Sequence, residues 1–154
     1  FIQKKYSEIP LYGLISLTIS DTKFKSLEGD YIEGAYNTPV ILNISAGYRI
    51  SNLWEVSGKF RLASGLPTTP FLPNGQRDYT KYNQGERLPI YDALDLRVDK
   101  RWVFSSLSLV TYIDVQNVYG RKNVAAVRWD YQTNQPEYQR SFGVLPSIGI
   151  NFEF

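Results

Sequence analysis

The sequence has no cysteine, no methionine and no histidine. Without cysteine the chain has no disulfide framework and no thiolate metal site. Without histidine it lacks the Ser/His and Asp/His arrangements on which hydrolases depend. It also lacks a strong charge of one sign, because 17 Lys and Arg against 15 Asp and Glu leave a net charge of +2. We therefore expect no enzymatic activity, no cofactor, no metal and no nucleic-acid partner.

Long hydrophobic runs are also missing. Mean hydropathy is negative, and no segment approaches the ~18 to 20 apolar residues that a membrane-spanning helix requires. Transmembrane β-strands need no such run, because they alternate apolar and polar residues. The aromatic content, 15%, fits either a β-rich core or two aromatic girdles at lipid–water boundaries.

What the sequence has instead is a repeated alternation of apolar and polar residues. In residues 54–64, WEVSGKFRLAS, every second residue from Trp54 to Leu62 is apolar or glycine, and the residues between them carry three charges. This period of two is that of a β-strand. In the strand expected at residues 92–102 the alternation is broken at Lys100, beside Trp102. Lys100 lies near the end of that strand, where a lysine side chain can reach a lipid–water interface. The same period predicts an all-β, antiparallel fold with six strands at residues 10–20, 40–50, 54–64, 92–102, 106–117 and 146–154.

The connections between these strands alternate between short and long. Residues 51–53 and 103–105 are short connections, whereas residues 21–39, 65–91 and 118–141 are long. Outer-membrane barrels show this alternation, with short periplasmic turns and long outer loops. Strands of about ten residues also match the length that a tilted transmembrane strand needs. The pattern predicts strands of a transmembrane β-barrel, with the C-terminus at the periplasmic side.

In such a barrel the apolar face contacts lipid and the charged face lines the lumen. We expect ion pairs and contacts with a plug on the charged face, and no catalytic pair of carboxylates. The residues expected to face the lumen are Glu55, Lys59, Arg61, Asp95, Arg97, Asp99, Arg101, Asp114 and Gln116.

Six strands are too few to close a bacterial barrel, which needs about eight. A charged interior is commoner in larger barrels with channels or plugs. We therefore expect residues 1–154 to be the C-terminal part of a larger barrel. The alternative is a complete eight-stranded barrel with an adhesion or structural role, in which residues 1–6 and a hairpin at 122–142 join the wall. A soluble, ligand-binding β-sandwich is a third reading.

Several segments resemble the end of the barrel of TonB-dependent outer-membrane transporters. They are YNTPVILNISAGYRI (36–50), GKFRLASGLPTTPF (58–71), ERLPIYDALDLRVDKRW (86–102), TYIDVQNVYGRKNV (111–124) and the closing LPSIGINFEF. The resemblance implies the last six strands of a plugged barrel of about 22 strands. It implies a place in the outer membrane of a Gram-negative bacterium, with the plug, the earlier strands and the segment that contacts TonB outside this sequence.

The family takes up scarce ligands such as ferric siderophores, cobalamin or glycans with energy passed through TonB. The resemblance therefore implies a small-molecule or glycan ligand, and no transport by this segment alone. It also implies that the closing strand is read by the barrel-assembly machinery. The residues of that expected signal share one face of the last strand: Ile148, Ile150, Phe152 and Phe154.

The long loops are where a ligand would make contact. Aromatic side chains beside polar groups suit stacking on sugars or on aromatic chelators, and they suit packing of loop on loop equally well. The candidates are Tyr79, Tyr82 and Arg87 in residues 65–91, and Arg128, Trp129 and Tyr131 in residues 118–141.

Overall fold

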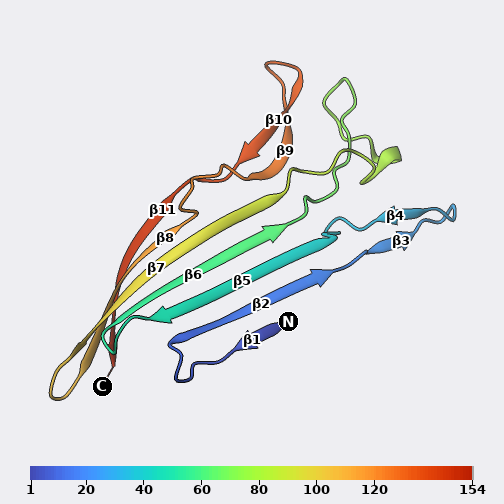
Figure 1. The fold of residues 1–154 in the computed structure, drawn as a ribbon. Coiled ribbons are helices and arrows are strands. Elements are labelled where there is room, and N and C mark those ends of the chain that lie inside the picture. The colour runs from blue at the N-terminus through green and yellow to red at the C-terminus, as the bar shows by residue number, and fades with distance from the viewer. Residues whose placement is uncertain (154) are drawn as a thin grey trace.

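A computed structural model describes residues 1–153, so Phe154, the last residue of the expected assembly signal, lies outside the described part. The fold is all-β and antiparallel (Figure 1). The main sheet has the strand order β1-β2-β5-β6-β7-β8-β11. Its strands are β1 (Ile2–Lys4), β2 (Leu11–Ile19), β5 (Val40–Arg49), β6 (Trp54–Ala63), β7 (Tyr91–Val103), β8 (Ser108–Gln116) and β11 (Leu145–Glu153).

The six long strands confirm the six strands predicted from the period of two, with bounds that differ by one or two residues. Residues 1–6 contribute the short strand β1, whose Ile2 lies opposite Ile15 of β2. The hairpin expected at residues 122–142 is formed by β9 (Val124–Asp130) and β10 (Gln135–Arg140), a separate two-stranded sheet. Among residues 1–153 the only helical segment is the 3-10 turn η1 (Tyr79–Lys81), and no helix is long and apolar enough to cross a membrane.

Two local features differ from the sequence-based expectation. The strand expected at 106–117 begins at Ser108, because residues 104–107 form the turn, which the Phe104 N–H closes by donating to the Leu107 carbonyl at 2.9 Å. Asn117 ends that strand with a φ of 52°. The hairpin of β3 (Lys23–Lys25) and β4 (Tyr31–Glu33) was not predicted, because strands of three residues are too short to show an alternation.

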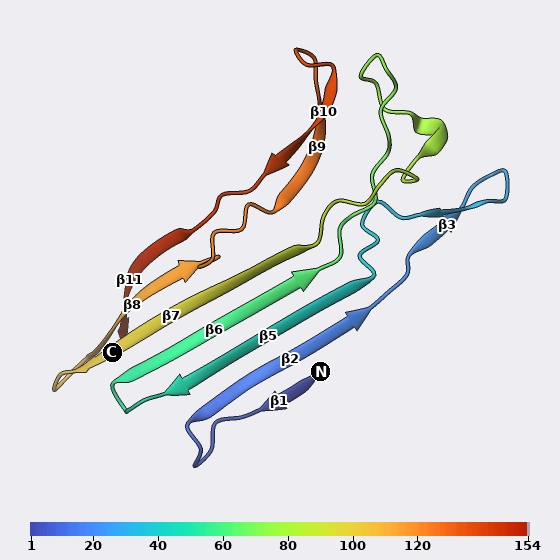
Figure 2. The ribbon, with the colours of Figure 1, turned by 45° about the horizontal axis from the view of Figure 1, so that its top comes forward.

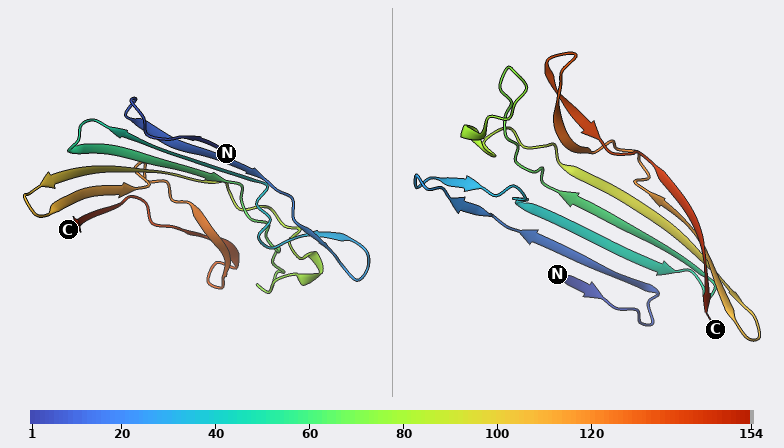
Figure 3. Two further views of the ribbon diagram at one scale, coloured as in Figure 1. Left: turned by 90° about the horizontal axis from the view of Figure 1, so that it is seen from below. Right: turned by 180° about the vertical axis from the view of Figure 1, so that it is seen from behind.

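The main sheet is a single curved layer (Figures 2 and 3). The short connections lie at one end with the C-terminal end of β11, and the long loops lie at the other. The cross-strand register puts Ile15, Ile44 and Phe60 in one row, and Ser45, Lys59 and Asp95 in a neighbouring row on the opposite face. The sheet therefore has one apolar and one charged face, as the alternation predicted.

Nothing in the described chain covers the apolar face. Ala93 is the one hydrophobic residue of residues 1–153 that is fully buried, whereas Ile148 keeps 83% of its surface exposed and Leu17 keeps 56%. The sheet is also open. β1 and β11 are its two edges, and no pairing between them occurs within residues 1–153, so the structure shows no closed barrel.

Two tyrosines cover glycines on the neighbouring strand. Tyr12 lies opposite Gly47, and Tyr112 lies opposite Gly149. A Cβ atom at either glycine would collide with the tyrosine ring. The Tyr12 hydroxyl also donates a hydrogen bond to the Glu55 carboxylate, two strands away. Aromatic cover of a glycine fixes strand register, because the ring fits only where the side chain is missing.

We expect Gly47→Ala to lower the stability of the sheet by about 1 to 3 kcal/mol, because the new methyl group displaces the Tyr12 ring and breaks its hydrogen bond to Glu55. Chemical unfolding followed by circular dichroism measures the change. Gly58→Ala is the control, since its Cβ would meet the end of the Leu96 side chain at 3.1 Å and the Asp95 carbonyl oxygen at an ordinary contact distance of 3.6 Å. Equal losses in the two variants would contradict the proposed role of the tyrosine.

Candidate functional site on the charged face and the long loops

The sheet brings together all nine residues expected to face a lumen. Register pairs such as Glu55 with Asp99, Lys59 with Asp95 and Arg97 with Asp114 hold them on one face across β6, β7 and β8. A hollow of about 790 Å³ lies against this face, and five of the nine, Lys59, Asp95, Arg97, Asp114 and Gln116, line it.

Most charges on this face are already paired. Arg61 binds Asp95 at 3.0 Å and Arg97 binds Asp99 at 2.6 Å. Arg49 pairs with Glu55, and Arg101 pairs with Glu153. The Arg97 guanidinium also lies 3.7 Å from the centre of the Tyr112 ring. Because each of these carboxylates has an arginine partner, they form a lattice of ion pairs and not a pair of carboxylates poised for acid–base chemistry.

Within residues 1–153, two of the charged side chains expected to face the lumen form no ion pair, and one buried nitrogen on the same face has no hydrogen-bond partner. Lys59 and Asp114 form no ion pair there, and the buried Nε of Arg61 has no acceptor. Buried polar atoms are normally hydrogen-bonded, and charges next to a low-dielectric surface gain from a counter-charge. These groups mark the part of the face that is best suited to contact another protein segment.

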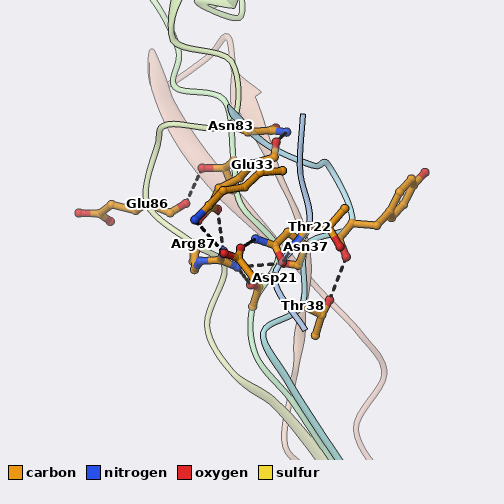
Figure 4. A network of polar contacts seen from close by, with 12 residues as sticks. Asp21, Thr22, Glu33, Asn37, Thr38, Asn83, Glu86 and Arg87 are labelled. Atoms are coloured by element: carbon orange, nitrogen blue, oxygen red, sulfur yellow. Dashed lines mark hydrogen bonds and ion pairs between the residues drawn. The ribbon is translucent and has the colours of Figure 1, made fainter. Parts of the chain in front are cut away.

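Arg87 joins two of the long loops (Figure 4). Its Nη2 donates to the Glu33 carboxylate at 2.6 Å, and its Nη1 donates to the backbone carbonyls of Asn37 and Gly65 at 3.0 and 2.8 Å. Asn37 is only 1% exposed and accepts a hydrogen bond from the Thr22 N–H. Because Glu33 and Arg87 are 54 residues apart, this cluster ties the loop of residues 20–39 to the loop of residues 64–90.

Arg77 joins the second of these loops to the β9–β10 hairpin. Its guanidinium donates to the Thr69 carbonyl and, at 2.7 Å, to the Val127 carbonyl. It also lies 3.9 Å from the centre of the Phe71 ring, which packs on Trp129 with centroids 5.5 Å apart. A cavity of about 460 Å³ opens beside Phe71 and Trp129.

A third cluster fixes the loop end of β7. The Asp92 carboxylate accepts from the Arg121 guanidinium and from the Tyr119 hydroxyl, and the Asn123 amide donates to the Asp92 carbonyl at 2.7 Å. Loss of solvent around the Tyr119 hydroxyl is the main cause that raises the pKa of Tyr119 to about 12, and the hydrogen bond to Asp92 is the second. At the tip of the hairpin, the backbone N–H of Gln132 and the Thr133 hydroxyl lower the pKa of Asp130, which stabilises the turn.

The six candidate ligand residues fall into two groups. Arg87, Trp129 and Tyr82 take part in packing between loops, and the Tyr82 ring lies 6.3 Å from the ring of Phe24 in β3. Tyr79 stacks on Tyr82 at 6.4 Å but stays 72% exposed. Tyr131 is 73% exposed at the hairpin tip, and Arg128 is exposed on β9. Tyr79, Arg128 and Tyr131 are therefore the candidates whose side chains remain open to a ligand.

Sequence reasoning missed the side chains that hold the loops together. Arg77 and Phe71 carry no local signature, because their partners lie in a distant hairpin. The buried asparagines Asn37, Asn83, Asn117 and Asn123 gave one available signal, since Asn is favoured where loops need backbone hydrogen bonds or positive φ, as at Asn83 and Asn117. Within residues 1–153 no group of three or more acidic, histidine or cysteine side chains is arranged to bind a metal.

Comparison with known proteins gives no relative. The chain matches no protein-family model, no curated protein and no solved structure.

We expect Arg87→Gln to loosen the loop of residues 20–39, because it removes the ion pair to Glu33 and two hydrogen bonds to carbonyls. A loss of about 2 kcal/mol would make amide exchange in that loop about thirtyfold faster. Hydrogen–deuterium exchange measured by mass spectrometry tests this. Lys25→Gln, an equal change of charge at an exposed position of β3, should leave exchange near Asn37 as it is. If both variants exchange alike, Arg87 does not hold the loops.

Proposed function

We propose that the chain forms the last strands of the barrel of a TonB-dependent transporter in the outer membrane of a Gram-negative bacterium. In this proposal the apolar face contacts lipid, the charged face lines the lumen and contacts the plug, and the long loops meet the ligand outside the cell. The observation that carries the membrane part is the uncovered apolar face of a one-layer sheet.

The size of that face argues against exposure to water. Six long strands at ~4.8 Å spacing and about nine residues at ~3.3 Å each give an area on the order of 900 Å². Monomeric soluble proteins rarely expose apolar patches of more than a few hundred Å². Lipid would cover such a face without any further element of the protein.

The two edges support a place in a larger barrel. Both β1 and β11 leave one row of backbone N–H and C=O groups without a strand partner in residues 1–153. In lipid an unpaired row costs several kcal/mol per group, so barrels close their edges. Further strands of a parent protein, which complete the barrel wall from the β11 edge round to the β1 edge, would form hydrogen bonds with both rows.

The assignment to TonB-dependent transporters rests on the resemblance of the strand segments. It gives this segment no catalytic role. TonB would act through the N-terminal part of the parent, the assembly machinery would read the closing strand with Ile148, Ile150 and Phe152, and the ligand would be a siderophore, cobalamin or a glycan. The charges that lack partners, Lys59 and Asp114, suit contact with the plug.

The mass of the native protein tests the parent. Outer membranes are solubilised in detergent, and the protein is detected with an antibody against residues 65–91. We expect a product several times larger than the 17.7 kDa of this chain. A band at 17.7 kDa whose electrophoretic mobility changes on heating would instead indicate a complete small barrel, and the transporter assignment would fail.

A pair of neighbouring substitutions tests which face meets lipid. Ile15 and Ser16 lie side by side in the middle of β2 on opposite faces. Ile15→Lys should destabilise the parent protein by about 2 to 4 kcal/mol, the cost of a lysine near the bilayer midplane. Ser16→Lys should change stability by less than about 1 kcal/mol. Unfolding by guanidinium in lipid vesicles measures both, and equal costs would rule out lipid on the apolar face.

A further inference from the structure

Lys100 is held between two tryptophans on the apolar face. It lies opposite Trp54 of β6 and two residues before Trp102 of its own strand. Its Nζ is 4.4 Å from the centre of each indole ring. The Trp102 indole is fixed in turn, because its Nε1 donates to the Thr111 hydroxyl at 3.1 Å. An ammonium over an indole face gains from cation–π attraction, so the two rings hold Lys100 in place.

The Lys100 ammonium has no acceptor of its own. Within residues 1–153 it forms no ion pair and donates no hydrogen bond. The carboxylates nearest in register, Asp99 and Glu153, lie on the other face and bind Arg97 and Arg101. Indole rings attract the charge but accept no ordinary hydrogen bond in their plane. Three N–H donors are therefore left for an acceptor from outside the chain.

This arrangement differs from the other charges on the same face. Lys4 of β1 donates to the Leu11 carbonyl at 2.8 Å. At the loop end of β7, Asp92 is paired with Arg121. Of the two lysines on this face of the described main sheet, Lys4 and Lys100, Lys100 is thus the one that is held by aromatic rings and left without a hydrogen-bond acceptor.

The surroundings of Lys100 are apolar and exposed. Trp54 is 40% exposed and Trp102 is 43% exposed, while Phe104 in the turn beyond them is 56% exposed. The site lies at the end of the sheet that has short turns, which the proposed function puts at the periplasmic boundary of the membrane. A ligand here must carry an anionic group for the ammonium and an apolar part for the face below it.

We propose that Lys100, Trp54 and Trp102 form a binding site for the phosphate of a phospholipid in the periplasmic leaflet. The ammonium donates to the phosphate oxygens, a charge-assisted hydrogen bond. The exposed edges of the two indoles lie at the level of the glycerol backbone, as aromatic side chains do at membrane interfaces. The acyl chains continue over Val98 and Leu96, which precede Lys100 in β7 and lie on the same apolar face, toward the middle of the strand. This inference rests on the proposed membrane position of the sheet.

Native mass spectrometry of the whole parent protein tests the site. The protein is purified in neutral detergent, and short-chain phosphatidylglycerol is added in steps. We expect Lys100→Gln to weaken binding of one phosphatidylglycerol about tenfold, as the loss of one charge-assisted hydrogen bond implies. Lys100→Arg keeps the cation between the rings and should restore most of the binding. The unfolding midpoint of each variant establishes that it is folded.

Lys122→Gln is the matched control, because Lys122 is an exposed lysine in the connection between β8 and β9, at the end of the sheet that has the long loops. It should leave lipid binding at the level of the unsubstituted protein. If Lys100→Gln and Lys122→Gln bind lipid alike, the site is overturned although the membrane position stands. Displacement of the lipid by inorganic phosphate at the same concentration would overturn the lipid as occupant. A parent protein recovered without detergent would overturn the proposed function itself.

Discussion

The structure depends on a cover for its apolar face that the described chain does not supply. In a sheet of one layer the backbone N–H and C=O groups are satisfied by hydrogen bonds between neighbouring strands. Such a sheet gains hydrophobic free energy only if something apolar covers its apolar face. Here Ala93 is the only fully buried hydrophobic residue of residues 1–153. The fold therefore has no core in the usual sense, and its stability depends on lipid or protein that covers the face and on strands that complete the edges.

That dependence explains why the register has to be strict. A slip of β6 by one residue would turn Lys59 and Arg61 to the apolar side, at a cost of about 4 to 8 kcal/mol in a bilayer. The ion pairs of the charged face add little free energy one by one, since exposed pairs contribute about 0 to 1 kcal/mol each. Tyr12 over Gly47 and Tyr112 over Gly149 fix the same register by shape. Charge and shape therefore exclude the same slipped states.

The sequence predicted what is local and missed what is not. Each long strand shows the alternation of apolar and polar residues within its own sequence, so the six long strands and the two faces of the sheet could be predicted from the sequence alone. The three-residue strands β3 and β4 are too short to show it. Contacts such as Arg87 with Glu33, or Lys100 with Trp54, join segments whose positions depend on the register of the whole sheet. No spacing along the chain contains that information, which is why these contacts appeared only with the structure.

The two ends of the sheet are built on different principles. At the end with short turns the connections are a few residues long, and Trp54 and Trp102 lie exposed on the apolar face with Lys100 between them. At the loop end Arg77, Arg87 and Arg121 each join separate segments by donating hydrogen bonds to backbone carbonyls. Arg87 and Arg121 also pair with a carboxylate, and Arg77 lies over the Phe71 ring. Arginine suits this task because its planar group offers five donors in fixed directions. Loops held in this way would lose little conformational entropy on binding the proposed ligand, because the exposed Tyr79 and Tyr131 belong to loops that are already ordered.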